Sequence, residues 1–171
     1  DSFGTTCSKV EYLLHDAITR QLVSDVPLCT FLSGGLDSSI ITKFAADYCQ
    51  KEGLLPLDTY SIDYVDNDKN FVKSDFQPNS DNYYINLMNK NLHTNHHQIV
   101  IDTPELAEYL EDAMIARDMP GMADIDSSLL LFCKNVKKEM TVSLTGECAD
   151  EIFGGYPWFF REDALNSGTF P

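Results

Sequence analysis

One loop constrains this chain more than any other feature of its sequence. An apolar run, Val26–Leu32, leads into the heptapeptide Ser33–Ser39, and an amphipathic segment, Ile40–Tyr48, follows it. This pattern predicts a buried strand, a glycine-rich turn and the start of a helix. At such a junction, the backbone N–H groups of the first helical turn and the helix dipole together favour a bound anion. The loop therefore predicts a phosphate site.

The side chains of this loop agree with that prediction. Gly34 and Gly35 allow a tight turn and let the backbone approach a ligand without an intervening Cβ. Asp37 is a carboxylate among phosphate-binding groups, so we expect it to hold a cation that bridges to the phosphates. Hydroxyl donors come from Ser33, Ser38 and Ser39. The alternative is an ordinary helix N-cap, but a cap needs only one Asp or Ser and neither glycine.

A second glycine-rich, acidic segment also follows an apolar run. Met140–Leu144 predicts a strand, and Thr145–Tyr156 comes directly after it with the sequence Thr-Gly-Glu-Cys-Ala-Asp-Glu-Ile-Phe-Gly-Gly-Tyr. Asp150 is the natural second ligand for a Mg²⁺ ion held by Asp37, although a carboxylate at a helix start is the simpler alternative. Glu147 is a candidate for binding substrate or moving a proton, the alternative being an exposed loop carboxylate.

Strands and helices alternate along the rest of the chain, which predicts a doubly wound α/β domain with a mainly parallel sheet and helices on both faces. The two remaining strands are expected at residues 57–64 and 98–101, and the helices at 8–22, 38–51, 81–92, 103–117 and 125–138. Residues 66–79 and 118–124 are expected to be loops. In such sheets ligands bind at the carboxyl ends of the strands, where the strand order reverses. Both glycine-rich segments follow strands, so we expect them to converge at that edge.

Composition excludes several classes of function. The chain has 27 acidic and 12 basic residues, for a formal net charge of −15, and its one short basic cluster is 134–138. Nucleic-acid binding requires clustered Lys and Arg, so it is not expected. No apolar run approaches the roughly 18 residues of a membrane span. Five scattered cysteines form no C-x-x-C pair, which is typical of a reduced, cytoplasmic protein.

Three histidines, His93, His96 and His97, precede the third predicted strand. They have no acidic or Cys neighbour in the sequence at metal-ligand spacing, so we expect loop histidines rather than a structural zinc site.

The first motif is neither a Walker P-loop nor a G-x-G-x-x-G dinucleotide loop, because the lysine and the required glycine spacing are absent. Without a lysine on the β- and γ-phosphates, release of pyrophosphate is a better expectation than γ-phosphoryl transfer.

Taken together, Ser33–Ser39 and Thr145–Tyr156 resemble the synthetase domain of glutamine-dependent asparagine synthetases. The first motif is shared by the wider group of N-type ATP pyrophosphatases, and the second is specific to asparagine synthetases and relatives such as β-lactam synthetases. The resemblance covers about residues 8–160 and implies the adenine nucleotide alpha hydrolase-like fold. It also implies an ATP- and Mg²⁺-dependent carbon–nitrogen ligase that forms β-aspartyl-AMP and pyrophosphate, after which ammonia gives asparagine.

The resemblance also implies roles for individual residues. Pyrophosphate would be held by Ser33, Gly35, Asp37 and Ser38, with Asp37 and Asp150 on Mg²⁺. The backbone of Leu32 and of Ile62 would read the adenine. Thr145 and Gly146 would lie beside the ribose and α-phosphate, and Glu147 beside the aspartyl group. Tyr156 is expected either to contact ligand or to pack in the core.

The chain departs from the family pattern in several respects. Thr145 replaces a more usual Ser, and Cys148 replaces a common Gly. The family's N-terminal glutaminase domain and a lysine beyond the second motif are missing from residues 1–171, so we expect a single, truncated domain that binds ATP but is weakly active or inactive alone. In the longer parent, ammonia would come from the glutaminase domain, and a homodimer is possible.

Other functions remain open at this point. They are a ligase of the same type acting on another carboxylate, a tRNA-modifying sulfur transferase and a non-catalytic nucleotide-binding module. The acidic charge and the missing C-x-x-C disfavour the sulfur transferase.

Overall fold

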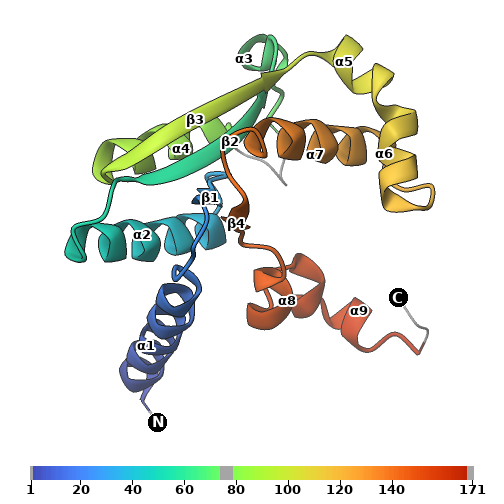
Figure 1. Ribbon diagram of the computed structural model, residues 1–171. Coiled ribbons are helices and arrows are strands. Elements are labelled where there is room, and N and C mark those ends of the chain that lie inside the picture. Colours follow the sequence, from blue (N-terminus) through green and yellow to red (C-terminus); the bar gives the residue numbers. More distant parts are fainter. Residues whose placement is uncertain (1, 74–78, 169–171) are drawn as a thin grey trace.

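A computed structural model describes residues 2–73 and 79–168. Its centre is a four-stranded, fully parallel sheet with the strand order β3-β2-β1-β4 (Figure 1). The strands are β1 (Leu28–Phe31), β2 (Leu57–Tyr64), β3 (Thr94–Ile101) and β4 (Val142–Leu144). The predicted doubly wound α/β class is therefore confirmed.

Helices precede, connect and follow these strands. They are α1 (Phe3–Gln21), α2 (Leu36–Lys51), α3 (Asn67–Asn70), α4 (Asp81–Asn91), α5 (Thr103–Glu108), α6 (Leu110–Arg117), α7 (Ala123–Val136), α8 (Ala149–Phe153), η1 (Pro157–Phe160) and α9 (Glu162–Leu165). Within the part of the chain that the structure describes, none of them combines the length and apolar character needed to cross a membrane.

The alternation of side chains along β1 gives the sheet two different faces. On one face, Leu28 packs into a cluster with residues of α1 and α2, centred on Ile18 and Ala45. On the other face, Cys29 and Phe31 pack against α7, where the rings of Phe31 and Phe132 meet edge to face at 4.7 Å. Figure 1 shows α7 crossing this second face while α4 lies behind the first. A central strand buried on both sides is typical of parallel sheets.

The strand order places the reversal point beside β1. The chain moves from β1 to β2 and β3 on one side, and then crosses back to place β4 on the other side of β1. The carboxyl ends of β1 and β4 are therefore neighbours, with Thr30 paired to Leu144. This is the edge at which doubly wound sheets bind ligands, and both glycine-rich segments leave the sheet there.

The third strand is longer than predicted, so the prediction of loop histidines is wrong for His96 and His97, whereas His93 does precede the strand. β3 begins at Thr94, so His96 and His97 belong to the strand. His97 Nε2 lies 2.8 Å from Asp58 Oδ1, an acidic partner that the sequence spacing did not reveal. His96 lies between two hydroxyls, with Nδ1 2.8 Å from Thr59 Oγ1 and Nε2 3.0 Å from Ser61 Oγ. Pairing between parallel strands creates these contacts, and local sequence spacing cannot show them.

Two predicted helices also differ from the structure. The helix expected at 103–117 is divided into α5 and α6 at Tyr109, and its N-cap is Asp102, whose side chain accepts a hydrogen bond from the Thr103 N–H at 2.8 Å. The first helix starts at Phe3 instead of residue 8, and Ser2 caps it. Residues 66–79 were expected to be a loop; they contain the short helix α3, and 74–78 lie outside the described residues.

A polar pair is buried between β1 and α2. The hydroxyls of Thr30 and Thr42 lie 3.0 Å apart, and both residues are fully buried. We expect Thr42→Val to lower the free energy of unfolding by about 1–3 kcal/mol, because it leaves the Thr30 hydroxyl buried without this partner. Chemical denaturation measures this, and the Thr30→Val/Thr42→Val double variant is the control. A double variant whose loss equals the sum of the two single losses would contradict the account.

His96 gives the fold a dependence on pH. Burial, and secondarily the neighbouring His97, lowers the pKa of His96 from its ordinary value of 6.5, so the folded state favours the neutral ring. The stabilisation is then fully present above pH 6.5 and is lost as the pH falls through the lower pKa of the folded state. We expect the melting temperature of His96→Gln to fall less steeply than that of the wild type under acidic conditions. Replacement of the exposed His93 by Gln is the control, and parallel profiles for wild type and His96→Gln would refute the assignment.

Candidate functional site

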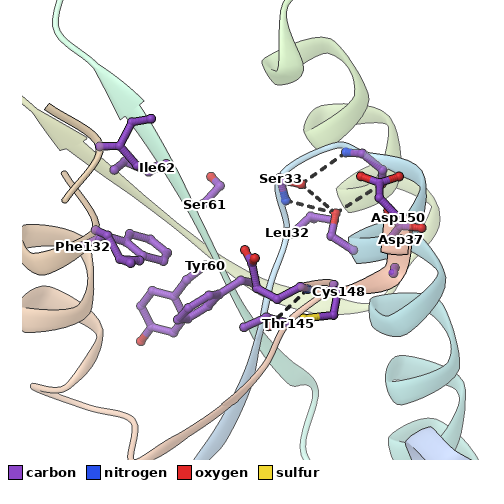
Figure 2. A pocket seen from close by; sticks show the side chains of 18 of the residues that line it. Leu32, Ser33, Asp37, Tyr60, Ser61, Ile62, Phe132, Thr145, Cys148 and Asp150 are labelled. Atoms are coloured by element: carbon purple, nitrogen blue, oxygen red, sulfur yellow. Dashed lines mark hydrogen bonds between the residues drawn. The ribbon is translucent and has the colours of Figure 1, made fainter. Parts of the chain in front are cut away.

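A cavity of about 530 Å³ opens at the carboxyl ends of β1, β2 and β4. Figure 2 shows its polar side, with Ser33, Asp37 and Asp150, opposite an aromatic side with Tyr60 and Phe132. The predicted site residues that line it are Leu32, Ser33, Gly35, Asp37, Ser38, Ile62, Thr145, Gly146, Glu147, Asp150 and Tyr156. The structure thus brings together eleven of the thirteen predicted residues.

The other two predicted residues, Gly34 and Ser39, are not among those that line the cavity. Gly34 has φ +83°, and a Cβ there would lie 2.8 Å from the carbonyl oxygen of Asp81 at the start of α4. A glycine is therefore required at this position by the turn and by the contact with α4. Ser39 lies within α2, where its N–H donates to the Gly35 carbonyl at 3.1 Å.

The phosphate loop is held in shape by its own serines. The Ser38 hydroxyl donates to the Gly35 carbonyl at 3.2 Å, accepts from the Ser33 N–H at 3.2 Å and lies 3.0 Å from the Ser33 hydroxyl. Gly35 is the N-cap of α2 and makes no side-chain cap hydrogen bond. The ordinary capping alternative is therefore not what the structure shows. The first turn of this 16-residue helix faces the cavity with its dipole.

Gly146 joins the two glycine-rich loops. A Cβ at this position would lie 3.0 Å from Asp37 Cβ and 3.1 Å from the backbone nitrogen of Ser38. The loop after β4 therefore touches the first turn of α2 directly, and a side chain would separate them. Thr145 shapes the same loop, because its hydroxyl accepts from the Glu147 N–H at 3.4 Å. Glu147 itself is exposed and lines the cavity.

Beyond Glu147, the second loop forms the short helix α8. Cys148 precedes it with φ +67°, a conformation in which Gly is favoured. Asp150 lies in the first turn, and its side chain lines the cavity. Tyr156 follows the helix as a half-buried residue whose hydroxyl donates to Glu151 Oε1 at 3.1 Å. This hydrogen bond raises the pKa of Tyr156. Tyr156 thus lines the cavity as a half-buried residue, and its contact with ligand stays a prediction.

Helix α7 supplies the cavity wall that the sequence analysis missed. Its lining residues are Ile125, Ser128, Leu129 and Phe132. Their spacing of three, four and seven residues marks one face of a helix, so periodicity was the available signal. Which element that face covers depends on the strand order, and the sequence did not establish that order. The Ser128 hydroxyl lies 2.6 Å from the Tyr64 hydroxyl and ties α7 to the end of β2.

The charged side chains that line the cavity, among the described residues, are all negative. Of the described residues that line it, four are carboxylates and none is Lys, Arg or His; the carboxylates are Asp37, Glu147, Asp150 and Glu151. Arg117 is not among the lining residues and pairs with Asp126, its Nη1 2.5 Å from Oδ1. A polyanion can enter such a cavity only with compensating cations.

The donor set suits Mg²⁺. Hard carboxylate and hydroxyl oxygens on facing loops are its usual protein ligands, and Mg²⁺ commonly takes one or two carboxylates together with phosphate oxygens and water. Among residues 2–73 and 79–168, no group of three or more His, Cys, Asp or Glu side chains forms a complete metal site. Asp37 and Asp150 could supply the two carboxylates of such an ion.

Comparison with known proteins agrees with this geometry. The chain is 60% identical over 171 residues to "Asparagine synthetase [glutamine-hydrolyzing] 3" of Bacillus subtilis, covering all of this chain and 28% of that protein. It is 26% identical over 171 residues to "Asparagine synthetase B [glutamine-hydrolyzing]" of Escherichia coli, covering 92% of this chain and 28% of that protein. It is also 31% identical over 160 residues to "Amidase chyE" of Penicillium rubens, covering 90% of this chain and 23% of that protein.

The chain thus spans about a quarter of the length of these curated relatives. The asparagine synthase family matches residues 9–171, nearly the whole sequence. With this match and the cavity at the reversal point of the sheet, the chain belongs to the asparagine synthase family.

Proposed function

We propose that this chain forms the ATP site of an enzyme that adenylates the side-chain carboxylate of aspartate for attack by ammonia, giving asparagine. The observation that carries this proposal is the direct contact of Gly146 with Asp37 and Ser38, which joins the two loops at one cavity. Family membership supports ATP as the nucleotide.

The two halves of the cavity suit the two halves of ATP. Phe31, Ile62 and Phe132 offer an apolar surface for adenine, whose edge would be read by the backbone of Leu32 and Ile62. The phosphates would lie on residues 33–38, at the start of α2. Thr145 and Gly146 would flank the ribose and the α-phosphate.

Mg²⁺ completes this arrangement. Four cavity carboxylates would repel ATP, so binding requires divalent cations between them and the phosphates. Asp37 and Asp150 would hold the ion from opposite loops, and when bound it would neutralise the charge that develops on pyrophosphate. The start of α2 would position the phosphates against the same charge.

The proposed reaction has two steps. A carboxylate oxygen of aspartate attacks the α-phosphorus, the bond to the β-phosphate oxygen breaks, and pyrophosphate leaves. Ammonia then attacks the acyl carbon, AMP leaves with the former carboxylate oxygen, and the nitrogen loses a proton. Glu147 lines the cavity together with Thr145 and Gly146 and would face the aspartyl group.

Partners and location are part of the same proposal. Ammonia would come from a glutaminase domain of a longer protein, which would form a homodimer, and the five free cysteines suit the cytoplasm. A ligase acting on another carboxylate is the second candidate, because no cationic side chain among the described lining residues is available to select aspartate.

Isotope transfer tests the proposed reaction. Aspartate labelled with ¹⁸O in its side-chain carboxylate is supplied with ATP, Mg²⁺ and ammonia to a full-length protein containing this chain. We expect one ¹⁸O atom in AMP for each asparagine formed. AMP formation with another carboxylate but not with aspartate would favour the second candidate, and ATP binding without AMP formation would indicate a non-catalytic module.

A substitution at Asp37 tests the proposed metal site. Because its carboxylate would hold Mg²⁺, we expect Asp37→Ala to weaken Mg²⁺-dependent ATP binding at least about tenfold. Calorimetric titration with and without Mg²⁺ measures this. Asp47→Ala is the matched control, since Asp47 lies on the same helix and pairs with Lys43 outside the cavity. Equal affinities for the two variants would rule out the assignment.

A substitution at Gly146 tests the contact between the two loops. A methyl group there must push apart the second loop and the first turn of α2, since its nearest neighbours include backbone atoms. We expect Gly146→Ala to weaken ATP binding about tenfold or more, because misplacement by a fraction of an ångström disrupts a shared site. Gly4→Ala on α1 is the control, as nothing lies within 4 Å of its added carbon. Wild-type affinity in Gly146→Ala would show that the loops need not touch.

A further inference from the structure

Helix α8 ends in a turn that folds the chain back over Asp150. Gly154 has φ +69°, and the N–H groups of Gly154 and Gly155 both point to the Asp150 carbonyl, the second at 2.9 Å. The Gly155 bond is the six-to-one bond of a Schellman motif, and the Gly154 bond is the five-to-one bond of the related αL motif. In the Schellman motif, the residue after the left-handed one lies against the side chain of the residue whose carbonyl it binds.

The pair of residues that meets in this turn is unusual. A Schellman motif commonly places two apolar side chains in contact at these positions. Here the positions hold Asp150, a carboxylate, and Gly155, which has no side chain. A Cβ on Gly155 would overlap Oδ1 of Asp150 and lie 2.9 Å from its Cγ. The carboxylate therefore lies directly over the bare Cα of Gly155.

The backbone around Gly155 is anchored on both sides. The preceding turn is closed by the hydrogen bonds to Asp150, and the following residue, Tyr156, donates to Glu151 at 3.1 Å. The Tyr156 ring also stacks on Trp158, with centroids 4.2 Å apart and planes 16° apart. Gly155 is thus a fixed surface against which the Asp150 side chain rests.

We propose that Gly155 is a positioning residue: its missing side chain lets the Asp150 carboxylate take the orientation in which it faces the cavity and can reach a metal–nucleotide ligand. This inference rests on the proposed function, because it concerns the same Mg²⁺–ATP site. Gly155 touches no ligand itself and acts through Asp150.

The neighbouring glycine provides a matched control. Gly154 adopts positive φ but has nothing within 4 Å of an added Cβ, so Gly154→Ala strains the backbone and leaves Asp150 in place. Gly155 does not adopt positive φ, so the first cost of Gly155→Ala is displacement of a side-chain end. One variant therefore tests the backbone and the other tests the carboxylate.

The experiment measures binding of Mn²⁺–ATP by electron paramagnetic resonance, together with the melting temperature without nucleotide. We expect Gly155→Ala to raise the half-saturating Mn²⁺ concentration about tenfold, as for other residues that orient a metal ligand, with a small change in melting temperature. Gly154→Ala should show the reverse, with a lower melting temperature and wild-type Mn²⁺ dependence. Asp150→Asn serves as the reference for loss of the ligand.

Two outcomes of the binding experiment overturn the inference, and they can be told apart. Wild-type protein that binds ATP equally with and without Mn²⁺ would remove the proposed function and this inference with it. Metal-dependent binding that Asp150→Asn weakens and Gly155→Ala leaves unchanged would remove the inference alone.

If Gly155→Ala does not fold, the Asp150→Ala/Gly155→Ala double variant should melt at the temperature of Asp150→Ala, because the overlap is with the carboxylate. A lower melting temperature would overturn the inference.

Discussion

The site depends on the close approach of two loops that leave the sheet from neighbouring strands. β4 pairs with β1, so the loop after β4 reaches the first turn of α2, and Gly146 allows the two backbones to touch beside Asp37. This contact determines the polar side of the cavity. It places Asp150 and Tyr156 around a common space with Ser33, and it leaves the aromatic end of β1 open toward α7.

Much of this arrangement could be predicted from local sequence, because its key segments carry their own signals. Two glycine-rich acidic loops directly follow apolar strands, and parallel strands place such loops at one edge. The pairing of His96 with Thr59 and Ser61, and the face of α7 that lines the cavity, could not be predicted in this way. Both arise from contacts between elements far apart in the chain, whose register and order no local pattern encodes.

The roles of individual glycines also could not be predicted fully from local sequence. Gly34 and Gly35 suggested a backbone open to ligand, but Gly34 is required by its contact with α4. Gly146 and Gly155 both leave room for carboxylate-bearing residues of the site, one at Asp37 and one at Asp150. Both glycines therefore affect where a carboxylate lies in a cavity whose charged side chains are all negative. A site lined by carboxylates binds a polyanion only when those carboxylates meet a cation in a defined place.

The most direct test of this account is a crystal structure of the chain with α,β-methylene ATP and Mn²⁺, using anomalous scattering to locate the metal. The account predicts one Mn²⁺ in contact with the carboxylates of both Asp37 and Asp150 and with the phosphates, and adenine against Phe31 and Phe132. A nucleotide bound elsewhere on the sheet, or a metal held by one loop alone, would contradict the claim that the two loops form a single site.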